Sequence, residues 1–206
     1  MTDSSRPGKI VCVGRNYRAH AKELGNDVPA EPLIFLKPPS SVIHTGDAIV
    51  LPTVSTQVEY EGEIGVVIGA RLSRADEEQA RRGIRGIVAL NDVTARDLQR
   101  SDGQWTRAKG FDTFCPIGDE VPAPADLHAL EVTTRVNGSV RQHATANEMV
   151  FAIPMLLAYI SSIMTLEPGD LVATGTPAGV GRLEVGDVVE VQVATSKVRN
   201  SVTQTG

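Results

Sequence analysis

The sequence is poor in cysteine, in aromatic residues and in long apolar runs. Its two cysteines, Cys12 and Cys115, form no C-x-x-C pattern, so we expect a reduced, cytoplasmic setting rather than a disulfide framework. Aromatic residues make up 4% of the chain, which leaves few platforms on which bases or sugars could stack. No stretch of about eighteen apolar residues occurs, so neither a transmembrane helix nor a membrane partner is expected.

Basic residues are also in the minority. The chain has 20 Lys and Arg against 25 Asp and Glu, and the net charge of −5 argues against nucleic acid as a partner. A small anionic substrate stays compatible, because local charge can oppose the net value. With 206 residues, 41% of them hydrophobic, we expect a single domain over residues 1–206 with flexible tails at 1–8 and 195–206.

Short apolar runs bounded by Gly and Pro predict strands, and Asn137-Gly138 predicts a two-residue hairpin. Strands are expected at 10–13, 33–36, 48–51, 58–69, 84–90, 131–136, 139–143, 171–173 and 188–193. Helices are expected at 17–24, 74–82 (after an N-cap at Ser73), 94–100 and 154–164, and 101–114 is expected to be irregular. Because the strands outnumber the helices without alternating regularly with them, the pattern predicts an α+β, mostly β fold with a mixed, curled sheet and short helices.

Carboxylates crowd the beginning of one apolar strand. Glu59, Glu61 and Glu63 stand two residues apart, so on a strand their side chains share one face. Asp92 follows another predicted strand. Such a group is either a solvated row of charges or a site for a hard cation, since oxygen-only ligands suit Mg²⁺, Mn²⁺ or Ca²⁺. Glu59 is interpreted as a solvated neighbour and not as a ligand.

Two further groups could carry chemistry. His20 and Glu23 stand three apart on a predicted helix, where the carboxylate could orient the imidazole, although an exposed surface pair fits the same spacing. Arg96 and Lys109, with Arg15 and Lys37 as weaker candidates, form a basic group. The segment 174–181 is rich in Gly, Thr and Pro and could present backbone N–H groups to an anion or simply form a tight loop.

Taken together, several segments resemble the fumarylacetoacetate hydrolase family, in the family's order over residues 10 to 190. The matching segments are Val-Cys-Val-Gly-Arg-Asn-Tyr at 11–17, Tyr-Glu-Gly-Glu at 60–63, Asn-Asp-Val-Thr-Ala-Arg-Asp at 91–97, Ala-Lys-Gly-Phe-Asp at 108–112, Pro-Gly-Asp at 168–170 and Thr-Gly-Thr-Pro at 174–177. Gly-Arg-Asn-Tyr followed by His20 and Glu23 is similar to the short branch of acylpyruvases and oxaloacetate decarboxylases. The resemblance implies the family's β-roll and a homodimer.

The resemblance also implies roles for particular residues. It implies Mg²⁺ or Mn²⁺, with Ca²⁺ as a substitute, bound by Glu61, Glu63 and Asp92. The implied catalytic residues are His20, Glu23 and Lys109, and the implied substrate-binding residues are Arg15, Arg96, Gln99, Gly175 and Thr176.

The function that this implies is hydrolysis of the C–C bond of 3-acylpyruvates, with His20 activating water and pyruvate enolate leaving. The same chemistry would serve two alternatives, decarboxylation of oxaloacetate and isomerisation or decarboxylation of unsaturated 2-oxo diacids of the 2-hydroxyhepta-2,4-diene-1,7-dioate type in aromatic catabolism. A non-catalytic module that binds a metal and a 2-oxo acid is the alternative of another class. In each case the expected partner is a small anionic 2-oxo acid.

Overall fold

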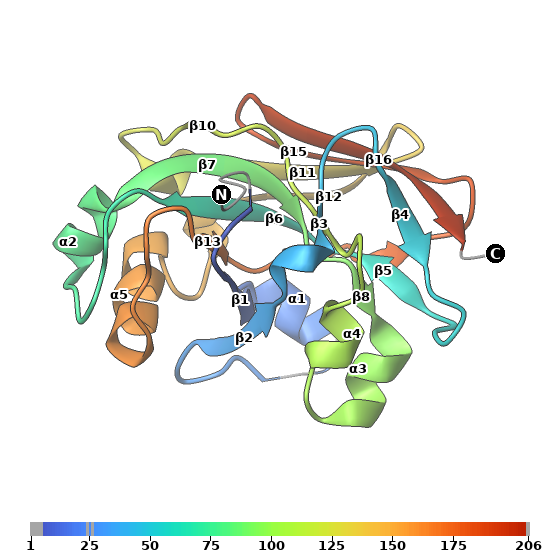
Figure 1. The fold of residues 1–206 in the computed structure, drawn as a ribbon, viewed down its shortest axis with the longest axis horizontal. Coiled ribbons are helices and arrows are strands. Elements are labelled where there is room, and N and C mark those ends of the chain that lie inside the picture. The colour runs from blue at the N-terminus through green and yellow to red at the C-terminus, as the bar shows by residue number, and fades with distance from the viewer. Residues whose placement is uncertain (1–5, 24, 26, 205–206) are drawn as a thin grey trace.

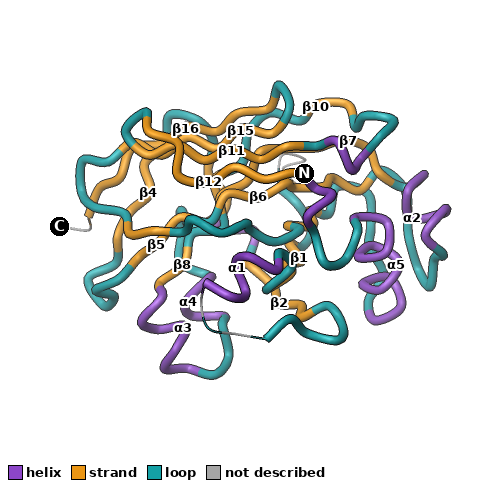
Figure 2. The backbone as a smooth tube through the Cα atoms, turned by 180° about the vertical axis from the view of Figure 1, so that it is seen from behind, coloured by secondary structure: helices purple, strands orange, loops and turns teal. Residues whose placement is uncertain are grey.

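The computed structural model describes residues 6–23, 25 and 27–204, and most of their regular structure is strand, as the sequence predicts. The strands are divided among a six-stranded, a five-stranded, a three-stranded and a two-stranded sheet. Figures 1 and 2 show the two large sheets lying across the molecule and the helices below them. The expected α+β, mostly β class with mixed sheets is confirmed. No helix among these residues is long and apolar enough to cross a membrane.

The six-stranded sheet runs in the order β10-β7-β6-β13-β1-β2. Its members are β1 (Ile10–Gly14), β2 (Leu33–Lys37), β6 (Gly62–Ile68), β7 (Ile84–Asn91), β10 (Val121–Pro122) and β13 (Leu171–Ala173). All seven residues of β6 are buried, because β7 and β13 pair with its two edges and apolar layers cover its faces. This explains its near-continuous apolar sequence.

The five-stranded sheet runs in the order β12-β11-β15-β16-β4. Its members are β4 (Ala48–Leu51), β11 (Glu131–Val136), β12 (Ser139–Thr145), β15 (Val188–Val193) and β16 (Ser196–Gln204). The hairpin between β11 and β12 turns at Asn137 and Gly138, whose φ angles of 52° and 80° suit a type I′ turn, as predicted.

The prediction of a flexible tail from residue 195 is wrong as far as residue 204. Strand β16 pairs with β15 on one side and β4 on the other. Its inward residues are Ser196, Val198, Asn200 and Val202, which alternate with exposed ones. Two of the four inward positions are polar, and this hides the period-two apolar pattern that marks a strand. Residues 205–206, and most of the tail expected at 1–8, lie outside the described residues.

Two small sheets complete the β structure. One is β14 (Gly181–Arg182), β5 (Val58–Tyr60) and β8 (Thr94–Ala95), and the other is β3 (Val42–Ile43) and β9 (Cys115–Pro116). The stretch expected as one strand over 58–69 is therefore two strands, β5 and β6, in different sheets. Glu61 lies at the break between them, where an interior strand of one sheet ends and an interior strand of the other begins.

The helices are short and lie in two groups (Figure 1). They are α1 (Arg18–Glu23), α2 (Glu77–Arg82), α3 (Arg96–Asp102), α4 (Thr106–Lys109) and α5 (Ile153–Ile163), with single 3₁₀ turns η1 (Pro39–Ser41), η2 (Leu127–Ala129) and η3 (Ala146–Glu148). Helices α2 and α5 pack together at one end of the molecule. Helix α1 lies beside β1, and α3 and α4 lie below β8 in Figure 1. All three contribute side chains to one cavity.

Two expected helices begin later than predicted, and one helix lies where none was expected. The N-cap of α2 is Asp76 and not Ser73, because Asp76 and Gln79 form a reciprocal capping box. Residues 94–95, expected to be helical, pair with β5, so α3 begins at Arg96. The segment 101–114, expected to be irregular, contains α4. The predicted end of α1 at Leu24 lies outside the described residues.

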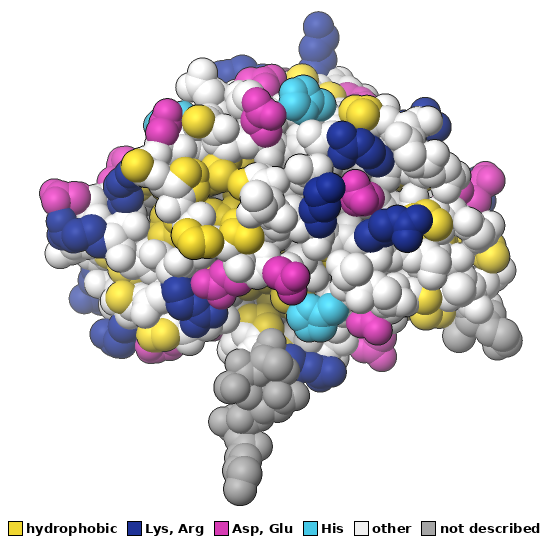
Figure 3. Space-filling model, turned by 90° about the horizontal axis from the view of Figure 1, so that it is seen from above, with side chains coloured by type: hydrophobic (Ala, Val, Ile, Leu, Met, Phe, Trp, Pro, Cys, Tyr) yellow, Lys and Arg dark blue, Asp and Glu magenta, His cyan; other side chains and the backbone are white. Residues whose placement is uncertain are grey.

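The largest apolar core lies between the two large sheets. It joins β6 residues Ile64 and Val66 to Val132 of β11, Val191 of β15 and Val198 of β16, and α5 adds its apolar face at one end. The face seen from above the view of Figure 1 carries a mixture of acidic, basic and apolar side chains. Figure 3 shows acidic and basic side chains interspersed around an apolar patch, so that face offers no continuous basic surface for nucleic acid.

Because β16 closes this core, we predict that Val198→Ala lowers the free energy of unfolding by about 2 kcal/mol, through lost apolar burial and the cavity that remains. Val198 is 1% exposed. Val140 on β12 is 56% exposed and provides the matched control, for which Val140→Ala should change stability by less than about 0.5 kcal/mol. Urea titration followed by circular dichroism measures both, and equal losses would contradict the placement of β16.

Candidate active site

Three carboxylates from two strand ends meet in one cavity. Glu61 lies between β5 and β6, Glu63 is on β6, and Asp92 follows β7. The Asp92 N–H donates to the Glu61 carbonyl at 2.8 Å, which ties the two strand ends together. One oxygen from each carboxylate lies within 4.8 Å of the others, and all three residues are at most 4% exposed. The structure therefore brings together the three residues that the sequence analysis assigns to a metal.

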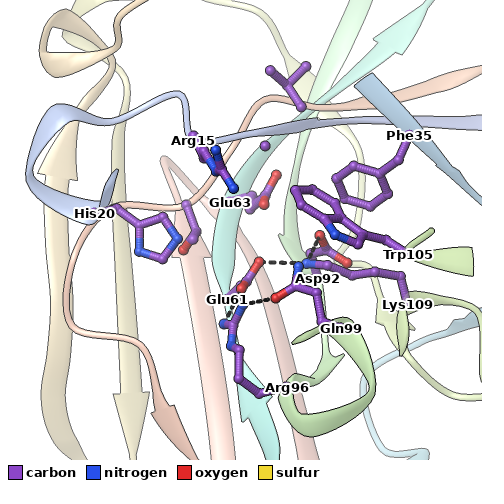
Figure 4. A pocket seen from close by; sticks show the side chains of 13 residues that line it. Arg15, His20, Phe35, Glu61, Glu63, Asp92, Arg96, Gln99, Trp105 and Lys109 are labelled. Atoms are coloured by element: carbon purple, nitrogen blue, oxygen red, sulfur yellow. Dashed lines mark hydrogen bonds and ion pairs between the residues drawn. The ribbon is translucent and has the colours of Figure 1, made fainter. Parts of the chain in front are cut away.

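Two lysines reach Asp92 from different directions. The Lys109 ammonium donates to Asp92 Oδ2 at 2.6 Å and to Glu61 Oε2 at 2.8 Å, so it lies among the carboxylates (Figure 4). The Lys37 ammonium donates to Asp92 Oδ1 at 2.6 Å and to the Val93 carbonyl at 3.2 Å. Burial lowers the pKa of Lys109, but Asp92 and Glu61 outweigh it and hold that pKa above its ordinary value. Lys37 was only a weak candidate from sequence.

Arg96 is held by two carboxylates and an amide. Its Nε donates to Glu59 Oε2 at 2.8 Å, its Nη2 donates to Glu61, and its Nη1 donates to Gln99 Oε1 at 2.5 Å. Glu59 is therefore a buried partner of Arg96, 7% exposed, and the interpretation of Glu59 as a solvated neighbour is wrong. Burial raises the pKa of Glu61, but Lys109 and Arg96 outweigh it and hold that pKa well below its usual range.

The charges of this cluster do not cancel. Four carboxylates (Glu59, Glu61, Glu63 and Asp92) meet three cations (Lys37, Arg96 and Lys109), which leaves a net charge of −1. Among the described residues, Glu63 has no ion pair, and its Oε2 accepts the Gly175 N–H at 2.7 Å. Burial, Asp92 and Glu61 raise the pKa of Glu63 well above its ordinary value.

This donor set fits a divalent cation. The three carboxylates offer hard oxygen ligands, and a cation would remove the cost of ionising the buried Glu63. The absence of His and Cys from the set argues against zinc.

His20 lines the cavity from α1, and its partner Glu23 lies outside the cavity with a side chain that is 34% exposed. His20 is 4% exposed, and its Nδ1 lies 3.3 Å from Glu23 Oε2. The Gly179 N–H donates to both oxygens of Glu23, at 3.0 and 3.2 Å. Figure 4 shows the imidazole on the side of the cavity opposite Lys109. The pair is therefore not a free surface pair, since Glu23 is anchored to the segment at 174–181.

That segment, here called the glycine loop (residues 174–181), hydrogen-bonds the segment that carries Glu61 and Glu63. Gly175 has a φ of 101° and directs its N–H at Glu63, and a Cβ there would lie 2.7 Å from the Asn16 Cβ. The Thr176 hydroxyl donates to the Gly62 carbonyl at 2.9 Å, although Thr176 also lines the cavity. Both residues, assigned to substrate from sequence, therefore contact the metal-ligand segment in this structure.

The cavity between these groups is small, with a volume of about 60 Å³. Arg15, whose φ of 58° is in the left-handed region, closes one side (Figure 4). Phe35 and Trp105 form an aromatic wall, edge to face with their ring centroids 5.2 Å apart. The Lys109 ammonium lies 5.1 Å from the centre of the Phe35 ring. Sequence reasoning missed both aromatics, because nothing in their local patterns separates a wall residue from a core residue.

Comparison with known proteins places the chain in a family. The family model described as fumarylacetoacetate (FAA) hydrolase C-terminal matches residues 9–203. The chain belongs to the fumarylacetoacetate hydrolase family. The resemblance predicted from the sequence is thus confirmed.

Three similar proteins illustrate the family. Oxaloacetate decarboxylase from Dictyostelium discoideum is 45% identical over 189 residues, covering 88% of this chain and 87% of that protein. Oxaloacetate tautomerase FAHD1 from Arabidopsis thaliana is 46% identical over 187 residues, covering 88% and 84%. The crystal structure of 2-hydroxyhepta-2,4-diene-1,7-dioate isomerase from Mycobacterium marinum superposes with a TM-score of 0.89 at 44% identity, covering 98% of this chain and 76% of that chain.

The raised pKa of Glu63 predicts a pH-dependent penalty in the metal-free protein. Glu63 does not affect the free energy of unfolding below the ordinary pKa of a glutamate. As the pH rises from there toward the higher pKa of Glu63 in the folded state, the free energy of unfolding falls, because Glu63 ionises first in the unfolded chain. Glu63→Gln should therefore raise the thermal midpoint of EDTA-treated protein at neutral pH. Mn²⁺ should raise the midpoint of the parent and leave that of the variant unchanged.

Glu120→Gln is the control for this prediction, since Glu120 pairs with Arg85 at the surface, away from the cavity. It should respond to Mn²⁺ as the parent does. A Glu63→Gln variant that is still stabilised by Mn²⁺ would remove Glu63 from the metal-ligand set.

Proposed function

We propose that the protein is an enzyme that moves a proton at C3 of oxaloacetate, interconverting its enol and keto forms, with decarboxylation of the same substrate as a second activity. The observation that supports this best is the placement of the buried His20 imidazole, paired with Glu23, across a 60 Å³ cavity from the carboxylate triad and its cations. That arrangement holds one proton-transfer group opposite a site for a chelated 2-oxo acid.

The named relatives support this reading over hydrolysis of acylpyruvates. Two of them, each at least 45% identical, are named for reactions of oxaloacetate. Acylpyruvate hydrolysis, the main expectation from sequence, has no such support, so the oxaloacetate alternative replaces it, with tautomerisation first and decarboxylation second. A module that only binds its ligand would not need a buried His20 whose partner is anchored by a backbone N–H.

A divalent cation, proposed to be Mg²⁺ or Mn²⁺ with Ca²⁺ as a substitute, would be held by Glu61, Glu63 and Asp92 and would supply Lewis-acid stabilisation of enolate charge. Lys109 and Arg96 direct positive charge into the same cavity and can stabilise the negative oxygen of the substrate. Arg15 and Gln99 line the cavity at its edge, where the second carboxylate of a diacid can be bound.

His20 moves the proton in this scheme. In the enol-to-keto direction His20, as the imidazolium stabilised by Glu23, delivers a proton to C3. The enol oxygen releases its own proton to solvent, from which His20 is protonated again. In decarboxylation the C3–C4 bond breaks and carbon dioxide leaves. The electron pair of that bond stays with C3 and forms the enolate of pyruvate. His20 then protonates C3 of that enolate. One residue in one position thus serves both reactions.

Isomerisation of unsaturated 2-oxo diacids is the second candidate, because of the similarity to the M. marinum isomerase structure. It needs the same proton transfer, over a longer carbon chain. Two relatives at least 45% identical are named for reactions of oxaloacetate, so we place oxaloacetate first. A homodimer stays a prediction, and we propose no nucleic-acid or membrane partner.

A substrate panel tests this function. The decay of enol-oxaloacetate absorbance and the release of pyruvate, coupled to lactate dehydrogenase, should both be faster with enzyme and Mn²⁺ than with Mn²⁺ alone, and EDTA should return both to their uncatalysed rates. Acetylpyruvate, fumarylpyruvate and hydroxyheptadienedioate are assayed in parallel. Faster turnover of an acylpyruvate than of oxaloacetate would reverse the order proposed here.

We predict that His20→Ala lowers kcat for oxaloacetate by at least about 100-fold, the usual contribution of a positioned general acid or base. His128→Ala, which removes an exposed imidazole elsewhere on the surface, is the control and should keep kcat. Normal turnover in His20→Ala would exclude the proton-transfer role.

Lys109→Met should lower kcat/KM by about 100- to 1,000-fold, as expected for loss of a buried charge that stabilises a developing anion. Arg107 lies two residues earlier on α4 and forms an exposed pair with Asp102. Arg107→Met therefore makes a similar change outside the cavity and should alter kcat/KM by no more than about twofold. Equal losses in the two variants would show that α4, and not the Lys109 ammonium, carries the effect.

A further inference from the structure

We infer that Gln142 is a positioning residue that fixes the glycine loop, and through it the His20–Glu23 pair, against the metal-ligand segment Glu61–Glu63. Only the kinetic part of this inference rests on the proposed function. Gln142 lies on β12, outside the cavity, and is 1% exposed. It comes from a hairpin in which no residue was assigned to the site.

The Gln142 amide joins the two parts of the site directly. Its Oε1 accepts the Gly62 N–H at 2.9 Å, and its Nε2 donates to Thr176 Oγ1 and to the Pro177 carbonyl, each at 2.8 Å. The backbone N–H can only donate and the carbonyl can only accept, so the orientation of the amide is fixed by its partners. No other neutral side chain of this length carries both functions.

Gly62, between Glu61 and Glu63, is held by hydrogen bonds on both sides and by close packing. Since Thr176 Oγ1 accepts from Gln142, its proton is free to bond the Gly62 carbonyl at 2.9 Å. Both backbone polar groups of Gly62 are thereby held, between the ligands Glu61 and Glu63. A Cβ on Gly62 would lie 1.9 Å from the Oγ1 of Thr134, the residue opposite Gln142 in the hairpin. The β11–β12 hairpin therefore packs directly on the ligand segment.

The other end reaches the histidine. A Cβ on Gly179 would lie 2.2 Å from the Arg141 carbonyl, so the glycine loop also packs on β12 one residue before Gln142. The Gly179 N–H then donates to Glu23, and Glu23 contacts His20. A continuous series of hydrogen bonds and packed backbone thus runs from Gly62 through Gln142 and the loop to the imidazole.

This series predicts a specific effect of removing the amide. Without the donations to Thr176 and Pro177, the loop can move away from β12, and Gly179 carries the Glu23 carboxylate with it. Because a displacement of about 1 Å at a catalytic group can cost about 100-fold in rate, the step that uses His20 should suffer most.

The first test is amide hydrogen exchange by mass spectrometry, which needs no substrate. In Gln142→Met, exchange should accelerate in peptides covering 174–181 and in peptides covering 17–23. The control is Gln192→Met on β15, where the amide donates to the Ala194 carbonyl, and it should leave both segments unchanged. Acceleration confined to 174–181, or in neither segment, would overturn the inference. Thr176→Val removes one link of the same series, should give the same pattern, and serves if Gln142→Met does not fold.

The second test is a double-mutant cycle with His20→Ala. Gln142→Met should lower kcat for oxaloacetate about 10- to 100-fold in the parent, and by less than about threefold when His20 is already Ala. Equal losses in the two backgrounds would show a role independent of His20 and would overturn the inference. If the parent shows no turnover of oxaloacetate, the proposed function fails, and the exchange experiment alone decides the role of Gln142.

Discussion

The structure depends on burying four carboxylates and three cations in one place. Each ion pair in such a cluster is costly to desolvate, and removing one partner leaves an uncompensated buried charge that costs about 3–5 kcal/mol. Lys37, Arg96 and Lys109 therefore cannot be regarded as independent contacts. They neutralise three of the four carboxylates and leave Glu63 without a cation among the described residues. One divalent cation would change the local net charge from −1 to +1, which suits a dianionic 2-oxo diacid.

The fold supplies the positions that this cluster requires. Two large sheets enclose an apolar core, and β6 passes through the six-stranded sheet with every residue buried. The ligands lie where β5, β6 and β7 begin or end, so that the sheets fix their backbone while the side chains share one cavity. The glycine loop and α1 then close the other side. The strands thus hold the charged side chains, and shorter, less regular segments bring His20 and Glu23, the proposed proton-transfer pair.

Local patterns were sufficient for much of this arrangement. Short apolar runs bounded by Gly and Pro predicted most strands, Asn137-Gly138 predicted the hairpin, and the spacing of the carboxylates suggested a shared face. The metal-ligand set and the roles of His20 and Lys109 came from resemblance to a family, since spacing alone left a solvated row of charges open. The structure brings those residues together, and their chemical roles stay predictions.

The rest depends on contacts between distant segments. Lys37, Glu59 and Gln142 each look like ordinary strand residues, and only tertiary packing shows Lys37 against Asp92, Glu59 against Arg96 and Gln142 between Gly62 and the glycine loop. Strand β16 was missed for a related reason. Its inward Ser196 and Asn200 are polar because they hydrogen-bond neighbouring segments, and a pattern of hydrophobicity cannot register that.

The most direct test of the charge argument is a crystal structure with Mn²⁺ and oxalate, with data collected at the manganese absorption edge. We predict a single anomalous peak within bonding distance of Glu61, Glu63 and Asp92, with the Lys109 ammonium displaced from at least one of the two carboxylates that it bridges. Absence of a peak there, or a Lys109 that still bridges Glu61 and Asp92 at saturating Mn²⁺, would contradict it.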